Sequence, residues 1–157
     1  MRYSYTFETT IGKLRITEDD SAITGLELPS ALKETDEEHD ETPLLLEAAR
    51  QLGDYFSGKL TVFSLPLAPA GTPFMKQVWD QLLKVPYGQT CSYKDIAVAI
   101  HRPLAVRAVG MANHRNPIAI IIPCHRIIGA NGSLIGYGGG LPLKQTLLDH
   151  EKRILHA

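Results

Sequence analysis

The sequence predicts a small N-terminal α/β domain, made of an antiparallel sheet and one helix, followed by a mainly α-helical domain with a helix-turn-helix. Residues 3–28 contain three short runs in which apolar and polar side chains alternate, as they do in half-buried strands. Two Thr-Pro pairs, which begin at Thr42 and Thr72, each precede an amphipathic run, and this order is typical of a helix N-cap followed by a first-turn proline. Helix-breaking residues gather at residues 66–71, and the domain boundary is predicted there.

The N-terminal domain is predicted to span residues 1–68. The acidic run at residues 33–41 is polar throughout and is expected to be an exposed loop. The helix that follows Thr42 is expected to end near Gly58, and a short strand remnant is expected within residues 62–71. The three alternating runs predict strands at residues 3–8, 13–17 and 23–28.

The C-terminal domain is predicted to span residues 72–157 and to be mostly helical. Ser92, with Asp95 three residues later, forms a variant of the capping box that opens a helix. Pro103 opens another short helix after a tight turn, and two short helices joined in this way indicate a helix-turn-helix. Pro142 opens the last helix. The expected helices cover residues 74–84, 93–100, 104–113 and 143–155.

The composition is that of a globular protein, because 44% of the residues are hydrophobic and 21% are charged, which excludes a disordered or collagen-like chain. No apolar run approaches the length of a membrane span, and the first ten residues lack the apolar core of a signal peptide. The two cysteines, Cys91 and Cys124, do not make a disulfide framework, which agrees with a reducing compartment. The protein is therefore expected in the cytoplasm, without a membrane partner.

Charge is distributed unevenly along the chain. Residues 1–71 carry 6 Lys and Arg against 13 Asp and Glu, whereas residues 72–157 carry 10 against 4 and hold five of the six histidines. An acidic first half and a basic second half favour a polyanion as the partner of the second half, although an accidental imbalance of charge on a solvated surface fits the same counts.

The run “IIIPCHRIIG” places a thiol, an imidazole and a guanidinium inside an apolar segment that is expected to begin as a strand. A buried cysteine is usually inert, but a hydrogen-bonding or cationic neighbour stabilises the thiolate, which is the nucleophilic form. Adjacent residues do not face each other on a strand or a helix, so either the backbone turns at Pro123 or a water molecule bridges Cys124 and His125. A carboxylate would then orient the imidazole, and the second half offers four: Asp80, Asp95, Asp149 and Glu151.

Metal and phosphate sites are not expected. No second cysteine or histidine pair lies at zinc spacing from Cys124, and residues 1–71 contain no cysteine. The glycines that follow Tyr137 match neither a P-loop nor a dinucleotide-binding pattern. Glycines at this point are instead expected to let the backbone approach a flat ligand closely. We therefore expect neither a metal nor a cofactor.

Three segments, “VPYGQTCSY”, “NPIAIIIPCHRIIGANG” and “GYGGGLPLKQTLLDHE”, closely resemble the O6-alkylguanine-DNA alkyltransferases. The resemblance covers residues 72–157, whereas the N-terminal part matches only in length and in its coarse pattern of strands and a helix. It implies a DNA-repair protein that binds double-stranded DNA, flips out O6-alkylguanine and transfers the alkyl group to the cysteine of PCHR, here Cys124. The thioether is stable, so each molecule would act once. The resemblance leaves open whether O4-alkylthymine is also repaired.

The resemblance also implies roles for the residues around the acceptor cysteine. Glu151 matches the family's acid and is selected from the four candidates. His125 would act as the base through a bridging water molecule, while Glu151 holds the imidazole tautomer. Asn116 matches an asparagine hinge that braces the helix-turn-helix against the acceptor segment. Arg126, which completes PCHR, is expected to tie nearby backbone rather than to take part in the chemistry.

The implied DNA-binding and pocket residues lie on both sides of PCHR. Tyr93 matches a tyrosine that crowds the 3′ phosphate and helps to rotate the base, and Arg107 matches the arginine that fills the vacated place in the base stack. The small residues around Arg107 would let the helix approach the minor groove. The DNA-binding set is completed by Ala105, Ala108 and Arg115. The expected pocket residues are Met111, Tyr137, Gly138, Gly139 and Gly140. Relatives often carry serine or alanine at Gly138, which leaves the range of alkyl groups open.

Some relatives bind a structural zinc ion through N-terminal cysteines and histidines, which this chain cannot do because its N-terminal half has no cysteine. A monomer without zinc is expected, and cooperative binding along DNA is left open. Two other functions are considered. One is a protein that binds alkylated lesions without repairing them, but such relatives carry tryptophan in place of the acceptor cysteine. The other is a cysteine hydrolase that uses Cys124, His125 and Glu151, which would leave the helix-turn-helix without a purpose.

Overall fold

The computed structural model describes residues 1–157, which form two compact units. The first unit consists of Met1–Ala70 and Pro117–Ile121, and the second consists of Gly71–Asn116 and Ile122–Ala157. The break after Ala70 lies at the end of the segment of helix breakers. Nothing in the sequence predicts that a second, distant segment joins the first unit.

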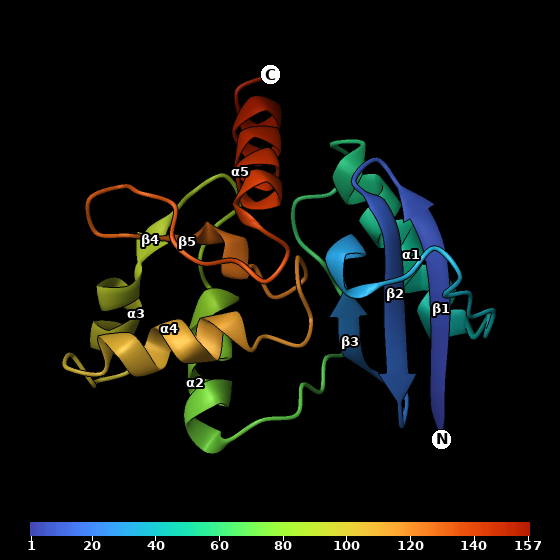
Figure 1. Ribbon diagram of the computed structural model, residues 1–157, viewed down its shortest axis with the longest axis horizontal. Coiled ribbons are helices and arrows are strands. Elements are labelled where there is room, and N and C mark those ends of the chain that lie inside the picture. Colours follow the sequence, from blue (N-terminus) through green and yellow to red (C-terminus); the bar gives the residue numbers. More distant parts are fainter. The chain divides into compact units, whose positions relative to one another are not determined.

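The first unit is built on an antiparallel sheet in the order β1-β2-β3, with α1 packed against it (Figure 1). Leu14 and Ile16, two residues apart on the central strand, are fully buried, as the alternating pattern predicts. Asp20 and Ser21 both have positive φ angles, 49° and 64°, which matches the twist of a two-residue hairpin turn. The strands are β1 (Arg2–Thr9), β2 (Gly12–Asp19) and β3 (Ala22–Glu27), and a short 3₁₀ turn, η1 (Pro29–Ala31), follows.

Helix α1 (Pro43–Phe56) begins where the sequence predicts, because the Thr42 side chain accepts a hydrogen bond from the Leu45 amide at 3.2 Å. The predicted strand remnant is a single bridge in which Leu67 pairs with Ile23 of β3. The acidic loop carries Glu38, whose carboxylate accepts a hydrogen bond from Arg15 at 2.8 Å, so the loop is tied to the sheet.

The prediction of a strand in the apolar run before PCHR is wrong. Only Ile118 pairs, in an isolated bridge with Leu26 of β3, and the Pro117 carbonyl accepts a hydrogen bond from the Leu26 amide at 2.9 Å. Ile120 has a φ of 69°, which an isoleucine rarely adopts. All five residues from 118 to 122 are buried. Burial of these side chains therefore overrides the preference of isoleucine for an extended strand.

The second unit is helical apart from two short parallel strands, β4 (Cys91–Ser92) and β5 (Ile127–Ile128). Thr72 caps α2 as predicted, and the indole of Trp79 on that helix donates to the Ala112 carbonyl of α4 at 2.8 Å. The predicted helix-turn-helix is confirmed as α3 followed by α4, which lie side by side (Figure 1). The helices are α2 (Pro73–Leu82), α3 (Tyr93–Ala99), α4 (Val106–His114) and α5 (Leu141–Leu155).

The starts of α3 and α4 differ in their capping. Ser92 and Asp95 form both hydrogen bonds of a capping box, which fixes the residue that follows, Tyr93, at the start of α3. Helix α4 begins at Val106, two residues later than predicted, and its N-cap residue, Ala105, makes no side-chain capping hydrogen bond. None of these helices combines the length and the apolar character that a membrane span requires.

Candidate active site

The acceptor segment forms a 3₁₀ turn, η2 (Cys124–Arg126), rather than a continuation of a strand. The Cys124 amide donates to the Ile122 carbonyl at 2.8 Å, and the Arg126 amide donates to the Pro123 carbonyl at 3.0 Å. The backbone therefore turns at Pro123, which was one of the two possibilities that the sequence allowed. The whole turn is buried: Cys124 is 6% exposed and His125 is 0% exposed.

His125 and Glu151 form a buried pair between η2 and α5. The Nε2 atom of His125 lies 2.7 Å from Oε2 of Glu151, and both side chains are almost completely buried. The other ring nitrogen, Nδ1, is also buried and has no hydrogen-bond partner in the protein. The turn at Pro123 therefore does not bring Nδ1 into a direct hydrogen bond with the Cys124 sulfur.

The pKa values of the pair decide its protonation. Burial lowers the pKa of His125, and the hydrogen bond and charge of Glu151 oppose this shift without reversing it. Burial by itself would raise the pKa of Glu151, but hydrogen bonds and electrostatic interactions with His125 and Arg126 together hold it well below 4.5. At neutral pH Glu151 is thus ionised and His125 is neutral. An ionised carboxylate only accepts, so Nε2 carries the proton and Nδ1 is the basic nitrogen.

Arg126 completes the surroundings of the Glu151 carboxylate. Its Nε donates to Oε1 at 2.8 Å and its Nη2 donates to Oε2 at 3.0 Å, while Nη1 donates to the Val85 carbonyl at 2.8 Å. The guanidinium also lies over the Tyr87 ring, 5.5 Å from its centroid. The Gly88 amide adds a fourth hydrogen bond to the carboxylate at 3.2 Å. The sequence predicts that Arg126 ties backbone, but it does not predict this bidentate contact with Glu151.

The Cys124 thiol is subject to opposing effects. Burial raises its pKa, whereas a hydrogen bond from the Asn116 side chain and the positive charge of Lys144 lower it, and the net shift is upward. Asn116 also donates from Nδ2 to the Ile122 carbonyl at 2.8 Å, so one amide holds the backbone just before Pro123 and contacts the acceptor. The role of Asn116 as a hinge for the helix-turn-helix stays a prediction. Lys144 is a neighbour that the sequence did not indicate.

The expected pocket residues differ in their burial. Tyr137 is 9% exposed, and its hydroxyl has no hydrogen-bond partner. Burial raises the pKa of this hydroxyl well above 10.0, and the Cys124 sulfur acts in the same direction. Gly138, Gly139 and Gly140 follow it directly in the loop before α5. Met111 is 52% exposed on α4, whereas Asn113 on the same helix is buried and donates to the Cys124 carbonyl at 3.4 Å. The contribution of Met111 to a lesion pocket stays a prediction.

The expected DNA-binding residues lie on the helix-turn-helix. The ring of Tyr93 packs over Gly110, where an added Cβ would lie 3.8 Å from the ring, so this aromatic side chain lies directly against α4. Its hydroxyl donates to the Ile135 carbonyl at 2.8 Å. Arg107, Ala108 and Arg115 are exposed, and Ala105 is partly exposed.

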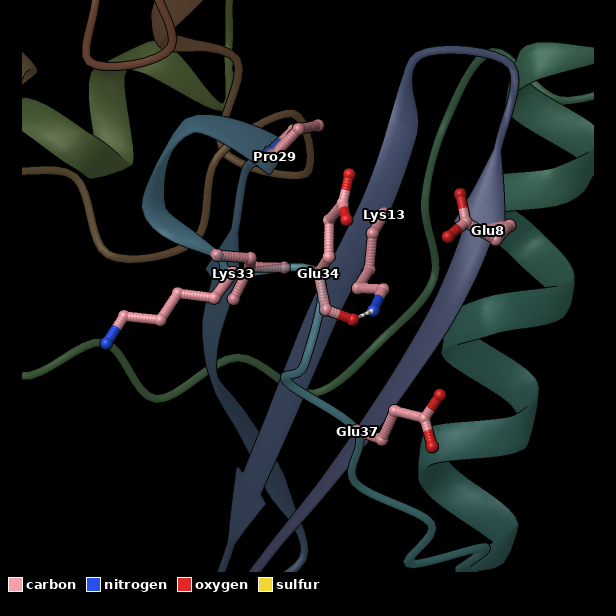
Figure 2. Close-up of a pocket in the computed structure, with 7 residues that line it drawn as sticks. Glu8, Lys13, Pro29, Lys33, Glu34 and Glu37 are labelled. Carbon is pink, nitrogen blue, oxygen red and sulfur yellow. Dashed lines mark hydrogen bonds between the residues drawn. The ribbon is translucent and has the colours of Figure 1, made fainter.

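A pocket of about 530 Å³ in the first unit is lined by none of the predicted site residues (Figure 2). The Lys13 ammonium is already engaged with the Glu34 and Asp36 carbonyls, at 2.8 and 3.0 Å. The Glu8 and Glu37 carboxylates do not converge on a common point in Figure 2. No group of three or more His, Cys, Asp or Glu side chains anywhere in the chain is placed to hold a metal ion. The pocket is lined by Glu8, Lys13, Pro29, Leu32, Lys33, Glu34 and Glu37.

Comparisons with known proteins identify the family of this chain. The profile of the 6-O-methylguanine DNA methyltransferase, DNA binding domain, matches residues 73–153, and that of the 6-O-methylguanine DNA methyltransferase, ribonuclease-like domain, matches residues 1–69. The constitutive methylated-DNA--protein-cysteine methyltransferase of Bacillus subtilis is 48% identical over 159 residues, covering 97% of this chain and 96% of that protein. The methylated-DNA--protein-cysteine methyltransferase of Mycobacterium leprae is 47% identical, covering 97% and 93%.

Solved structures give the same result. The crystal structure of Mycobacterium tuberculosis OGT in complex with DNA superposes with a TM-score of 0.88 at 44% identity, covering 97% of this chain and 94% of that one. An O6-methylguanine DNA methyltransferase from Methanococcus jannaschii, 24% identical with a TM-score of 0.71, supports the fold. Both parts of the chain are matched by the family's profiles, and relatives nearly half identical span almost its full length. The chain therefore belongs to the 6-O-methylguanine DNA methyltransferase family.

Proposed function

We propose that this chain repairs DNA by transferring the alkyl group of O6-alkylguanine in double-stranded DNA to its own Cys124. The observation that carries the proposal is a buried cysteine next to a neutral histidine whose ring is oriented by an ionised carboxylate. The names of the relatives, methylated-DNA--protein-cysteine methyltransferases, and the DNA-bound structure of the Mycobacterium tuberculosis protein support the same activity.

The proposed chemistry begins with the removal of the thiol proton. The proton moves from the Cys124 sulfur through a bridging water molecule to Nδ1 of His125, because Nδ1 is the basic nitrogen and has no partner in the protein. The imidazolium that forms is stabilised by Glu151, 2.7 Å from Nε2. The thiolate attacks the alkyl carbon, and the bond between that carbon and O6 breaks. The electron pair stays on the base, which takes up a proton to become guanine.

The product explains why the protein would act only once. A thioether is chemically stable, so the new carbon–sulfur bond should persist. Each molecule is thus a stoichiometric reagent that inactivates itself. We also propose that it acts as a monomer, without zinc or any other cofactor, in the cytoplasm.

Access to Cys124 requires that the damaged base leave the duplex. A sulfur in a residue only 6% exposed cannot reach a stacked base, so the nucleotide must be flipped out at a cost of a few kcal/mol. Arg107 is proposed to fill the vacated place in the stack, and Tyr93 to press on the neighbouring phosphate. The small residues Ala105 and Ala108 are proposed to let α4 approach the DNA, and Arg115 to support this contact. The proposed pocket for the flipped base is formed by Met111, Tyr137, Gly138, Gly139 and Gly140.

Intact-protein and peptide mass spectrometry after incubation with an O6-methylguanine duplex tests the proposal. One methyl group should be gained, on the peptide that contains Cys124, and the reaction should stop at one equivalent. Tight, selective binding without a mass gain would instead make the protein a lesion sensor. Release of product beyond one equivalent would support a cysteine hydrolase.

Replacing Arg107 by Ala should separate binding from chemistry. Transfer from the duplex should slow by about tenfold or more, since an interaction of ~1.4 kcal/mol is worth a factor of ten, while reaction with free O6-methylguanine base should stay within about twofold of the wild type. The rates of methyl transfer from the duplex and from the free base, measured by stopping the reaction at a series of times, test this separation. Lys76→Ala, which removes an exposed positive charge from α2, is the matched control. Equal losses with both substrates would make Arg107 a structural residue.

A further inference from the structure

Asn113 is a buried side chain of α4 that contacts the acceptor turn. Its exposed fraction is 3%, and its Nδ2 atom donates to the Cys124 carbonyl at 3.4 Å. The preceding residue, Ala112, accepts the hydrogen bond from the Trp79 indole at 2.8 Å, which fixes this end of α4. Only the nitrogen of an amide side chain can donate to a carbonyl, so the orientation of the Asn113 amide is defined.

The oxygen of the same amide, Oδ1 of Asn113, is buried and has no hydrogen-bond partner in the protein. Oδ1 is bonded to the same carbon atom as Nδ2, so it lies beside the acceptor turn as well. A buried amide oxygen without a donor is unfavourable, and ordered water molecules satisfy such atoms where the protein does not. The oxygen of Asn113 therefore requires a donor other than a protein group.

A second buried acceptor without a partner belongs to the residue that follows Cys124. It is Nδ1 of His125, the basic nitrogen of the ring. The hydroxyl of Tyr137 is also buried without a partner, but it carries one proton and cannot donate to both acceptors. A water molecule carries two protons, and a buried water molecule typically makes about three hydrogen bonds to polar groups that are otherwise unsatisfied. One water molecule can thus satisfy both acceptors and still accept a proton from the Cys124 thiol.

We propose that Asn113 is a positioning residue for alkyl transfer: its side-chain oxygen holds the water molecule that carries the thiol proton of Cys124 to His125. This water donates one proton to Nδ1 and the other to Oδ1. It takes up the thiol proton as it gives the first of these to Nδ1, so it ends unchanged between a thiolate and an imidazolium. The inference rests on the proposed function, in which Cys124 reacts as a thiolate and His125 is the base.

Such a proton relay has a characteristic pH dependence. Burial lowers the pKa of His125 and raises the pKa of Cys124. Between these two values the proton stays within the site, so the rate of reaction of the sulfur does not depend on pH. Without the relay the thiol must lose its proton to the solvent, and the thiolate then increases about tenfold for each pH unit below the pKa of the thiol.

The other titratable and charged groups near the acceptor are shared by all the proteins to be compared. Tyr93 and Tyr137 are neutral at neutral pH, because burial raises the pKa of each. The charged groups are Arg126 of η2 and two residues of α5, Lys144 and Glu151. Their effects are the same in each protein, so a difference in pH dependence reports on Asn113.

The test compares the wild type with three full-length variants. Asn113→Leu replaces the amide by an apolar group of similar size, Asn113→Ala removes it without adding bulk, and Gln89→Leu changes an exposed amide of the same unit as the matched control. The first readout is the rate of reaction of Cys124 with iodoacetamide between about pH 7 and 9, resolved from Cys91 by peptide mass spectrometry. This readout requires no DNA. The second is the rate of methyl transfer from an O6-methylguanine duplex over the same range. The fluorescence of Trp79 confirms folding, since its indole contacts the residue before position 113.

In the wild type and in Gln89→Leu, both rates should be nearly independent of pH over this range. In Asn113→Leu, both should be slower at pH 7 by about tenfold or more, because the contribution of the base is lost, and should rise about tenfold for each pH unit. Asn113→Ala should show the same rise, and it decides the question if Asn113→Leu does not fold.

Two results would overturn the inference. One is a rate that is independent of pH in a folded Asn113 variant, even if that rate is low, because the amide would then only support the turn. The other is a tenfold rise for each pH unit in the wild type, because no relay would then operate. If the wild type takes no methyl group but the two iodoacetamide profiles still differ, the proposed function fails and the role of Asn113 stands. If the wild type is methylated once and the profiles coincide, only the inference fails.

Discussion

Replacement of Cys124 by Ala should abolish methyl transfer completely while selective binding of the lesion remains. The sulfur is the only nucleophile that the turn η2 presents next to His125, and the imidazole itself is held by Glu151. Alanine removes one atom from a residue that is 6% exposed, so the turn and the helix-turn-helix should fold unchanged. Mass spectrometry measures the methyl group gained, and fluorescence anisotropy with an O6-methylguanine duplex measures binding.

Cys91→Ala is the matched control for this experiment. Cys91 is partly buried in β4, and burial, together with the charge of Asp95, raises its pKa to about 11, so it is a thiol at neutral pH. Its replacement should leave the single methyl group on Cys124. A methyl group found on any residue of the Cys124→Ala protein would refute the assignment of the acceptor.

Replacement of Glu151 by Ala should strongly destabilise the second unit. The carboxylate accepts hydrogen bonds from His125, Arg126 and the Gly88 amide. Its removal leaves the Arg126 guanidinium buried and without its carboxylate, and breaking a buried pair in this way costs about 3–5 kcal/mol. Urea unfolding followed by Trp79 fluorescence measures the loss in the free energy of unfolding. Asp149→Ala, exposed on the same helix, should cost less than about 0.5 kcal/mol.

The same carboxylate predicts how stability depends on pH. The pKa of Glu151 in the folded protein lies well below its ordinary value of 4.5. Its contribution is therefore fully present above about pH 4.5 and is lost as the pH falls from there toward the folded pKa. Glu151→Gln should remove this part of the acid dependence. Identical slopes of stability against pH for the wild type and Glu151→Gln below pH 4.5 would contradict the predicted depression.

A pair of substitutions distinguishes the loss of the charge pair from the loss of packing. If the uncompensated guanidinium is the main cost, Arg126→Leu combined with Glu151→Leu should be less destabilising than Glu151→Ala alone, because apolar groups can replace a buried ion pair at little cost. Both proteins should lack efficient transfer, since neither orients His125. The double variant would thus be more stable than Glu151→Ala and would still lack efficient transfer.

The sequence alone determined most of the elements and the acceptor of the site. The strands of the first unit and the four helices of the second follow from local features, such as the alternation around Leu14 and Ile16 and the caps at Thr42, Thr72 and Ser92. Such features act over a few residues and can be read directly. The acceptor, Cys124, followed from an unusual thiol within an apolar run together with the resemblance of its flanking segments to a family.

The resemblance named His125, Glu151 and Asn116 around that acceptor, but only the tertiary structure showed the contacts that join Glu151 to Arg126 and to the Gly88 amide. Glu151 lies 25 and 26 residues from Arg126 and His125, and the Gly88 amide lies 63 residues away, so no local pattern could place them on one carboxylate. The isoleucine run has the composition of a strand, yet burial of its side chains in the first unit bends it at Ile120. The burial of Lys144 was hidden for a similar reason, although a lysine in the first turn of a helix, against the dipole, was a signal. Local preferences set the elements, whereas the energies of buried charges and packed side chains depend on groups that only folding brings together.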